Sequence, residues 1–185
     1  QKTLIGATLG LGLLALGGMV LGSFGLYKPW AASALLAGLW VTGYSELHPA
    51  LESLAPARSL LKERPLWAMA AALPLLAALW MCLVPPHQYD SLVYHLALPQ
   101  AYVREGRLFA PPGIVYAHFP QNGEMLFTLA LLLGSDLLGQ MFMWLSTVLS
   151  IWWVYSLGRH EAPLNAVALA CVLISTHTAV LLMSS

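Results

Sequence analysis

Charge is the scarcest property of this sequence. Of its 185 residues, 8 are Lys or Arg and 8 are Asp or Glu, so charged residues make up only 9%. Soluble domains carry about 25% charged residues. The formal net charge is zero, which argues against a nucleic-acid-binding surface. A hydrophobic content of 59% in so short a chain indicates that lipid is its solvent.

Cysteine is equally scarce, and its placement excludes a disulfide framework. Cys82 and Cys171 both lie inside apolar runs without metal-ligand or disulfide spacing. Both are therefore typical of small buried side chains. Three histidines, His87, His95 and His118, share one loop but lack the tight ligand spacing of a structural zinc site.

Polar stretches are few, and apolar runs fill most of the chain. Their lengths predict an all-α, polytopic integral membrane bundle of about six membrane helices, since about 20 apolar residues cross a bilayer. The runs cover residues 4–26, 30–45, 66–84, 121–134, 137–157 and 164–183. Gly134, Ser135 and Asp136 look like a break between two helices, but a single bent helix over 121–157 is also compatible with the pattern.

Basic residues set the expected orientation. Arg58, Lys62 and Arg64 cluster in the polar segment 46–64, which the positive-inside rule assigns to the cytoplasm. The following run then carries the chain outward, so we expect the loop 85–123 to be extracytoplasmic.

Two regions follow from this pattern. Residues 1–64 hold two transmembrane helices and a cytoplasmic interfacial segment, and residues 65–185 hold the remaining helices and the external loop. The chain starts at Gln1 and stops directly after an apolar run. We therefore expect it to be a piece of a longer membrane protein.

The external loop is too long for a simple connection, and its aromatic content argues against disorder. Asp90 or Ser91 is suited to cap a helix over about 91–106, which Gly106 would end. Beyond this helix, Pro111, Pro112 and Gly113 predict an extended stretch up to His118.

Asp90 is the first candidate for chemistry. Its carboxylate is set beside Tyr89 and Tyr94 just outside a membrane helix, where it can take a proton from a hydroxyl or hold a divalent cation. His95 lies one helical turn from Ser91. A helix cap is the more frequent role of Asp at such a position, and the two roles are compatible.

Glu124 is the second acidic candidate. It lies at the start of a helix, where the helix dipole stabilises a carboxylate, and this is also its ordinary structural role. Asp90 and Glu124 flank the same loop, so the fold can bring them together. Arg104 and Arg107 are candidates to bind phosphate, although such side chains more often face water or lipid headgroups.

His177 lies within the last apolar run. An intramembrane histidine is a functional candidate by default, here for a pigment or haem. Ser175, Thr176 and Thr178 offer it ordinary hydrogen-bond partners. For His177 we expect such a hydrogen-bonded structural role rather than a cofactor-binding one.

The order of these segments resembles a known family. A membrane helix is followed by YDSLVYHLALPQAYVREGRL, a Pro-rich gap, FPQNGEMLFTLALLLG and a second long helix that ends in LGRH. This is similar to the amino-terminal part of the GT-C type polytopic membrane glycosyltransferases, especially the bacterial relatives of protein mannosyltransferases and the lipid A aminoarabinose transferase. The likeness covers about residues 66–160. In that family an acidic residue of the first external loop is essential, and the sugar comes from a polyprenyl-phosphate carrier.

The resemblance implies roles for individual residues. Asp90 would be the loop carboxylate, as a base or a metal-assisting group, with Glu124 as the second catalytic-site acid. Tyr94 and His95 would line the same pocket, and Tyr89, Arg104 and Arg107 complete the candidate substrate-binding residues. Many members carry paired acidic residues, whereas Asp90 is followed by Ser91. The expected function is sugar transfer to an extracytoplasmic acceptor, and the alternative is a non-catalytic transmembrane subunit of a larger membrane complex, a pigment-associated one included.

Overall fold

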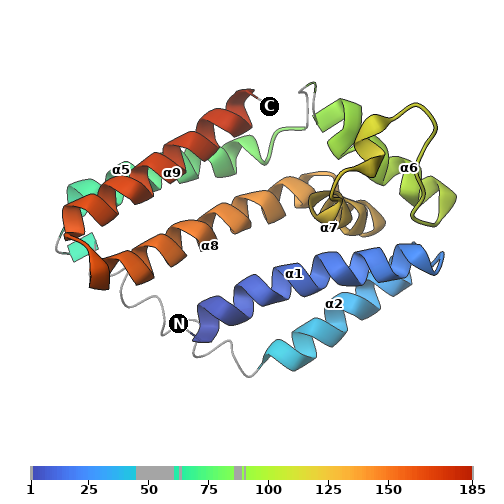
Figure 1. Cartoon of the computed structure of the whole chain (residues 1–185), viewed down its shortest axis with the longest axis horizontal. Coiled ribbons are helices and arrows are strands. Elements are labelled where there is room, and N and C mark those ends of the chain that lie inside the picture. Colours follow the sequence, from blue (N-terminus) through green and yellow to red (C-terminus); the bar gives the residue numbers. More distant parts are fainter. Residues whose placement is uncertain (1, 45–60, 63, 86–88, 90, 185) are drawn as a thin grey trace. The chain divides into compact units, whose positions relative to one another are not determined.

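The computed structural model describes residues 2–44, 61–62, 64–85, 89 and 91–184 (Figure 1). The regular elements among these residues are all helices, with no strand, which confirms the all-α prediction. The seven α-helices among them are α1 (Lys2–Ser23), α2 (Pro29–Gly43), α5 (Pro65–Met81), α6 (Ala97–Glu105), α7 (Asn122–Leu132), α8 (Leu137–Glu161) and α9 (Leu164–Ser184). A π-helix, η2 (Ser91–His95), and a 3-10 helix, η3 (Val115–His118), lie within the loop 85–123.

Residues 121–157 form two helices rather than one. Gly134 ends the turn after α7 with a φ of +83°, a backbone conformation that glycine adopts without steric cost. The hydroxyl of Ser135 then accepts a hydrogen bond of 3.2 Å from the N–H of Leu138, in the first turn of α8. The break predicted at residues 134–136 is confirmed.

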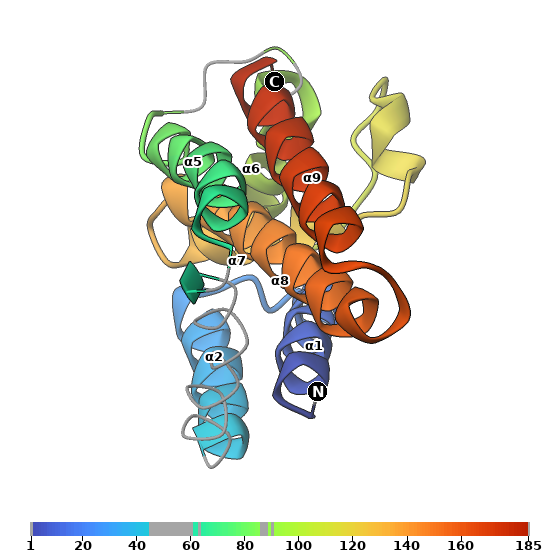
Figure 2. The same ribbon diagram turned by 90° about the vertical axis from the view of Figure 1, so that its left-hand side faces the viewer.

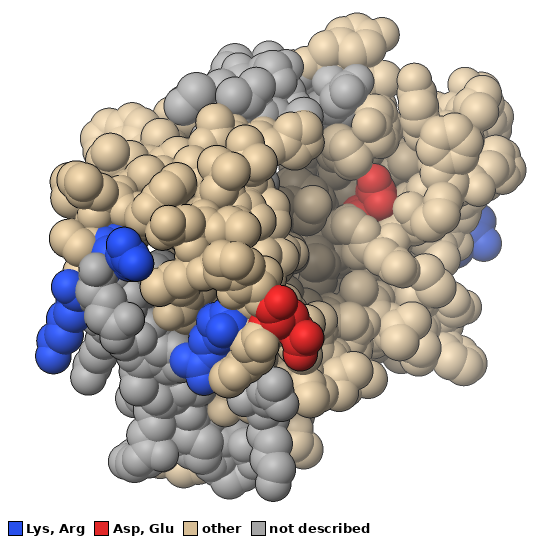
Figure 3. All heavy atoms as spheres, turned by 60° about the vertical axis from the view of Figure 1, so that its left-hand side comes forward, with Lys and Arg blue, Asp and Glu red and all other residues tan. Residues whose placement is uncertain are grey.

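Two of the described helices are long and apolar enough to cross a membrane, Thr3–Ser23 and Leu137–Glu161. Three more apolar helices are shorter, at Pro65–Met81, Asn122–Leu132 and Leu164–His177. Only 22% of the first span and 11% of the second are buried inside the molecule, less than in the central helix of a soluble core. Figure 3 shows one face of the molecule, on which charged side chains are few. These features are consistent with membrane association, and the arrangement with six spans stays a prediction.

The chain divides into two compact units. The first contains residues 1–8, 43–83 and 144–184, and the second contains residues 9–42 and 84–143. The predicted division at residues 64 and 65 concerns regions of the sequence and stays a prediction. Most of the predicted polar segment 46–64 lies outside the described residues.

In the first unit, α5 packs along α9 (Figures 1 and 2). The helix α5 contains Pro74 in its interior, and the indole N–H of Trp144 donates a hydrogen bond of 2.9 Å to the carbonyl of the next residue, Leu75. A neighbouring helix thus bonds the backbone beside the proline, as is common in membrane proteins. Cys171 is buried in a small cluster with Tyr155 and is a free thiol, as its apolar surroundings predict.

In the second unit, the turn between α1 and α2 is tied to the end of α6. The N–H of Tyr27 donates to the carbonyl of Gly106 at 3.1 Å, and the N–H of Leu108 donates to the carbonyl of Gly22 at 2.9 Å. Gly106 ends α6 in the left-handed conformation, with a φ of +71°, as the sequence predicts. These two backbone bonds dock the loop 85–123 on the α1–α2 turn.

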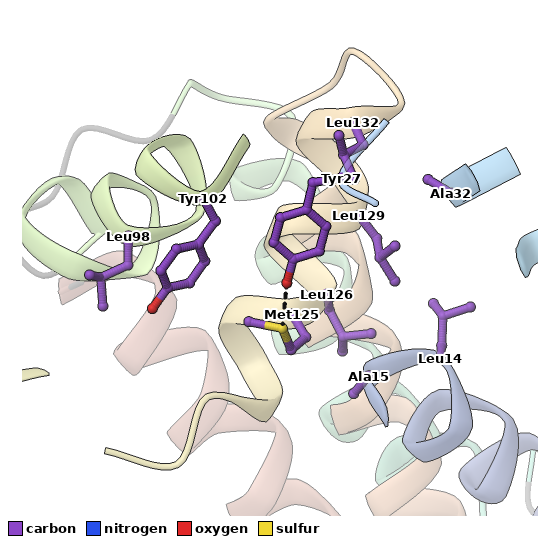
Figure 4. Close-up of a cluster of buried hydrophobic side chains, with 10 residues drawn as sticks. All are labelled: Leu14, Ala15, Tyr27, Ala32, Leu98, Tyr102, Met125, Leu126, Leu129 and Leu132. Atoms are coloured by element: carbon purple, nitrogen blue, oxygen red, sulfur yellow. Dashed lines mark hydrogen bonds between the residues drawn. The ribbon is translucent and has the colours of Figure 1, made fainter. Parts of the chain in front are cut away.

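The helix α7 lies at the centre of this unit. It is buried from Glu124 through Ala130, so its apolar side chains meet protein all around. Figure 4 shows the cluster, in which the phenol of Tyr27 donates a hydrogen bond of 3.1 Å to the sulfur of Met125. The cluster contains Leu14 and Ala15 of α1, Tyr27, Ala32 of α2, Leu98 and Tyr102 of α6, and Met125, Leu126, Leu129 and Leu132 of α7.

A glycine on α1 makes room for this arrangement. A methyl group at Gly22 would collide with the ring and hydroxyl of Tyr27, whereas one at Gly12 would meet nothing within 4 Å. We expect Gly22→Ala to destabilise the second unit by about 1–3 kcal/mol, as overpacking does. Gly12→Ala is the matched control, and it should be neutral or slightly stabilising because alanine favours helix. Thermal unfolding in detergent micelles measures both, and equal melting temperatures would contradict the expectation.

Candidate active site

The candidate site lies where the loop 85–123 meets the start of α7. The predicted helix over 91–106 is divided into η2 and α6. Pro99 explains the division: in a continuous α-helix it would lie in the interior and lack the N–H that bonds the carbonyl of His95. In α6 it lies in the first turn, where a missing N–H costs little. The cap predicted at Asp90 or Ser91 stays a prediction, since Asp90 and the side chain of Ser91 lie outside the described part of the chain.

The expectation of an extended chain up to His118 is wrong. Gly113 turns the backbone with a φ of +81°, and η3 follows at Val115–His118. The side chain of Gln121 bonds one carbonyl of this turn and the carbonyl of the residue that follows it. The Nε2 of Gln121 donates to the carbonyl of Tyr116 at 2.8 Å and to that of Phe119 at 3.1 Å.

The fold pairs two of the predicted site residues. The Nδ1 of His95 lies 2.9 Å from Oε1 of Glu124, although the residues are 29 positions apart. The Glu124 side chain is 8% exposed and that of His95 is 39% exposed. Glu124 lies in the first turn of α7, as predicted. The pair therefore joins a buried carboxylate to an imidazole that solvent can reach.

Two aromatic rings lie near the imidazole. The ring of Tyr94 lies 4.0 Å from that of His95, and the ring of Phe127 lies 6.3 Å from it at an interplanar angle of 22°. Tyr94 in turn stacks on Tyr116 of η3 with ring centroids 4.4 Å apart. The contact of Tyr94 with Tyr116 and that of His95 with Glu124 therefore place η2 against η3 and α7.

Gln121 links this arrangement to α6. Its Oε1 accepts a hydrogen bond of 3.1 Å from the phenol of Tyr102, and its side-chain amide donates to the carbonyls of Tyr116 in η3 and of Phe119 just after it. Gln121 is buried, and Tyr102 is fully buried. Buried polar groups are normally bonded in this way, because an unmet one is costly. Gln121 thus connects α6, η3 and the first turn of α7.

Burial raises the pKa of two tyrosines near the site. Burial raises the pKa of Tyr102, and the negative charge of Glu124 raises it further. Burial likewise raises the pKa of Tyr27 well above its ordinary value of 10.0, with a smaller contribution from Tyr102. A tyrosine of ordinary pKa is already protonated at neutral pH, and burial only widens that margin. Both phenols accordingly donate hydrogen bonds, to Gln121 and to Met125.

The remaining predicted residues lie at exposed positions. Tyr89 is 78% exposed, and Arg104 at the end of α6 and Arg107 just after it are exposed. His177 is exposed on α9 in the first unit. Their predicted roles toward phosphate, substrate and pigment stay predictions.

The described residues do not assemble a metal site. No group of three His, Cys, Asp or Glu side chains among them is placed to hold an ion. His95 and Glu124 are bonded to each other, and a cation between them would replace that bond. Asp90, the predicted ligand, lies outside the described residues, so the divalent cation stays a prediction and no chemistry is derived through it.

Sequence reasoning missed two residues of the site. Gln121 and Phe127 hold η3 and the imidazole in place, yet nothing in their local sequence marks them. In the sequence, Gln121 is distinguished only as a polar residue between Pro120 and an apolar helix. An exposed side chain is ordinary at such a position. Only the docking of η3 on α7 gives it buried partners.

No family model, curated protein or solved structure matches the chain. A function is therefore inferred from the sequence pattern and from the geometry of this site.

Proposed function

We propose that the chain is part of an integral-membrane glycosyltransferase of the GT-C type. It transfers a sugar from a polyprenyl-phosphate carrier to an acceptor on the extracytoplasmic side of a bacterial inner membrane. The observation that carries the proposal is the pair of His95 and Glu124, 2.9 Å apart, at the junction of the loop 85–123 with α7. An accessible imidazole bonded to a buried carboxylate is a common acid–base arrangement in enzymes.

The chemistry of transfer matches the composition of this region. A hydroxyl must lose a proton as the isoprenoid phosphate departs, so a proton-accepting group is needed beside an apolar surface. The loop 85–123 exposes apolar side chains, among them Leu92, Val115 and Phe119. These suit contact with an isoprenoid chain or with the bilayer, and Arg104 and Arg107 are the candidate phosphate ligands.

The wider topology belongs to the same proposal. About six membrane helices place the segment 46–64 in the cytoplasm and the loop 85–123 outside. Asp90 is the loop carboxylate, as base or metal-assisting group, and Tyr89 and Tyr94 line the substrate pocket. The positive-inside bias and the two spans long enough to cross a bilayer support this arrangement.

A transfer assay tests the proposal. The full-length protein is reconstituted in proteoliposomes with undecaprenyl phosphate bearing ¹⁴C-labelled mannose, glucose or 4-amino-4-deoxyarabinose, each tested separately with a bacterial membrane extract as the acceptor source. We expect label to pass from one carrier to the extract. Asp90→Asn should abolish the transfer while membrane insertion persists. Absence of transfer from all three carriers would contradict the proposal, and full transfer by Asp90→Asn would remove Asp90 from its role.

A second function is a non-catalytic transmembrane subunit of a larger complex. It is favoured by the large apolar side chains that α5 and α9 expose, including Leu73, Trp80 and Leu173, which suit a neighbouring subunit. Purification in mild detergent discriminates the two: a stoichiometric complex without carrier turnover favours the subunit. A pigment-binding form would absorb visible light, and His177→Ala would remove that absorbance.

A further inference from the structure

We infer that His95 is the proton-accepting catalytic residue of this site and that Glu124 is its positioning residue. This inference rests on the proposed function and refines it: the sequence assigns the catalytic role to the acids and only a binding role to His95, whereas with His95 as the base Asp90 keeps only the metal-assisting role. The two residues differ in what a substrate can reach. Glu124 is 8% exposed and His95 is 39% exposed, so only the imidazole is open to an acceptor hydroxyl.

The hydrogen bond selects one tautomer of the imidazole. A carboxylate only accepts hydrogen bonds, so Nδ1 of His95 carries the proton that faces Oε1 of Glu124, at 2.9 Å. In the neutral ring the other nitrogen, Nε2, then lacks a proton and is the acceptor. Glu124 thereby fixes which nitrogen is available for catalysis.

The surroundings also restrict rotation of the ring. The rings of Tyr94 and Phe127 neighbour it, with centroids 4.0 and 6.3 Å away, and Tyr94 stacks on Tyr116 of η3. The η3 backbone is in turn bonded by the Gln121 side chain. A base held in one orientation loses little freedom when it meets its substrate, which favours catalysis over mere surface bonding.

The step that follows is balanced. The acceptor hydroxyl transfers its proton to Nε2 of His95, and its oxygen forms a bond to the anomeric carbon of the sugar. The bond from that carbon to the carrier phosphate breaks, and the isoprenoid phosphate leaves with the electron pair. The imidazolium so formed lies beside the Glu124 carboxylate, which stabilises its charge.

Chemical rescue of activity tests the inference in the full-length protein, with the labelled carriers described above. We expect His95→Ala to lower transfer by about 10²–10⁴-fold, the usual contribution of a general base. Added imidazole should restore transfer in a saturable way, since it can occupy the gap beside Tyr94, whereas a purely structural histidine would not be rescued by a base. His118→Ala is the matched control, an exposed histidine on η3 in the same loop, and it should transfer within about twofold of the wild type.

The outcomes separate the inference from the proposed function. If the wild type transfers no sugar, the proposed function fails. If the wild type transfers and His95→Ala does so equally well, or loses activity that imidazole does not restore, the inference is overturned while the function stands.

A spectroscopic measurement does not depend on activity. In ¹⁵N-histidine-labelled protein in nanodiscs, multiple-bond ¹H–¹⁵N spectra distinguish the two neutral tautomers, and His95→Gln assigns the signal. We expect protonation on Nδ1 in the wild type and a shift toward the Nε2-protonated form in Glu124→Ala. A wild-type signal protonated on Nε2 would overturn the inference.

Discussion

Replacing Gln121 by methionine is expected to destabilise the second unit by about 1–3 kcal/mol, the cost of leaving the buried phenol of Tyr102 without its hydrogen-bond partner. The glutamine side chain takes part in three hydrogen bonds, with the Tyr102 phenol and with the carbonyls of Tyr116 and Phe119. Methionine has a similar length and volume, so the loss is of bonding rather than packing. The phenol of Tyr102 is fully buried and has no access to water in exchange.

Two measurements check this expectation. Thermal unfolding in micelles reports the loss of stability, and amide hydrogen exchange should become faster in η3, where Gln121 no longer bonds the carbonyls. Gln100→Met is the matched control, since Gln100 is exposed on α6 in the same unit. Equal stability and equal exchange in the two variants would refute the role given to Gln121.

Replacing Leu129 by alanine is expected to cost about 2–3 kcal/mol, the lower part of the range for a buried leucine in a protein core. Leu129 is fully buried on α7, and a methyl group at Gly18 of α1 would touch its side chain at 3.4 Å. Its removal leaves a cavity between the two helices. The lower part of the range applies because lipid is as apolar as the core, so that mainly the packing contribution is lost.

The control for this variant lies on α1. Leu13 is 53% exposed, and Leu13→Ala removes the same atoms from a surface position. We expect the control to unfold close to the wild-type midpoint in a denaturing-detergent titration, with Leu129→Ala clearly lower. A cost for Leu13→Ala as large as that for Leu129→Ala would contradict the packing described for α7.

The local features of the fold could be predicted because short-range rules determine them. An uninterrupted apolar run must satisfy its backbone internally, which predicts a helix in each of the six runs. Gly106 and Gly134 end helices in the left-handed region, where glycine alone carries no steric penalty. The division of 91–106 at Leu96 follows from the same kind of rule, since it leaves Pro99 in the first turn of α6.

The candidate site could be predicted only in part. The sequence indicates Glu124 and His95 as separate candidate site residues, but it does not indicate that they contact each other. Their contact depends on how η2, η3 and α7 dock, and no rule of sequence spacing reports a contact over 29 positions. Gln121 escaped notice for the same reason, since its buried partners come from α6 and η3.

The order of synthesis determines when the backbone hydrogen bond between Tyr27 and Gly106 can form. The ribosome delivers the N–H of Tyr27 before its acceptor exists, because the acceptor carbonyl lies 79 positions later in the chain. The turn between α1 and α2 therefore lacks this hydrogen bond until the end of α6 has been synthesised and docks on it. Closing a contact between residues so far apart in the chain is entropically slow. We therefore expect the assembly of this region to be limited by the docking of α6, which is made late, rather than by the formation of α1 and α2.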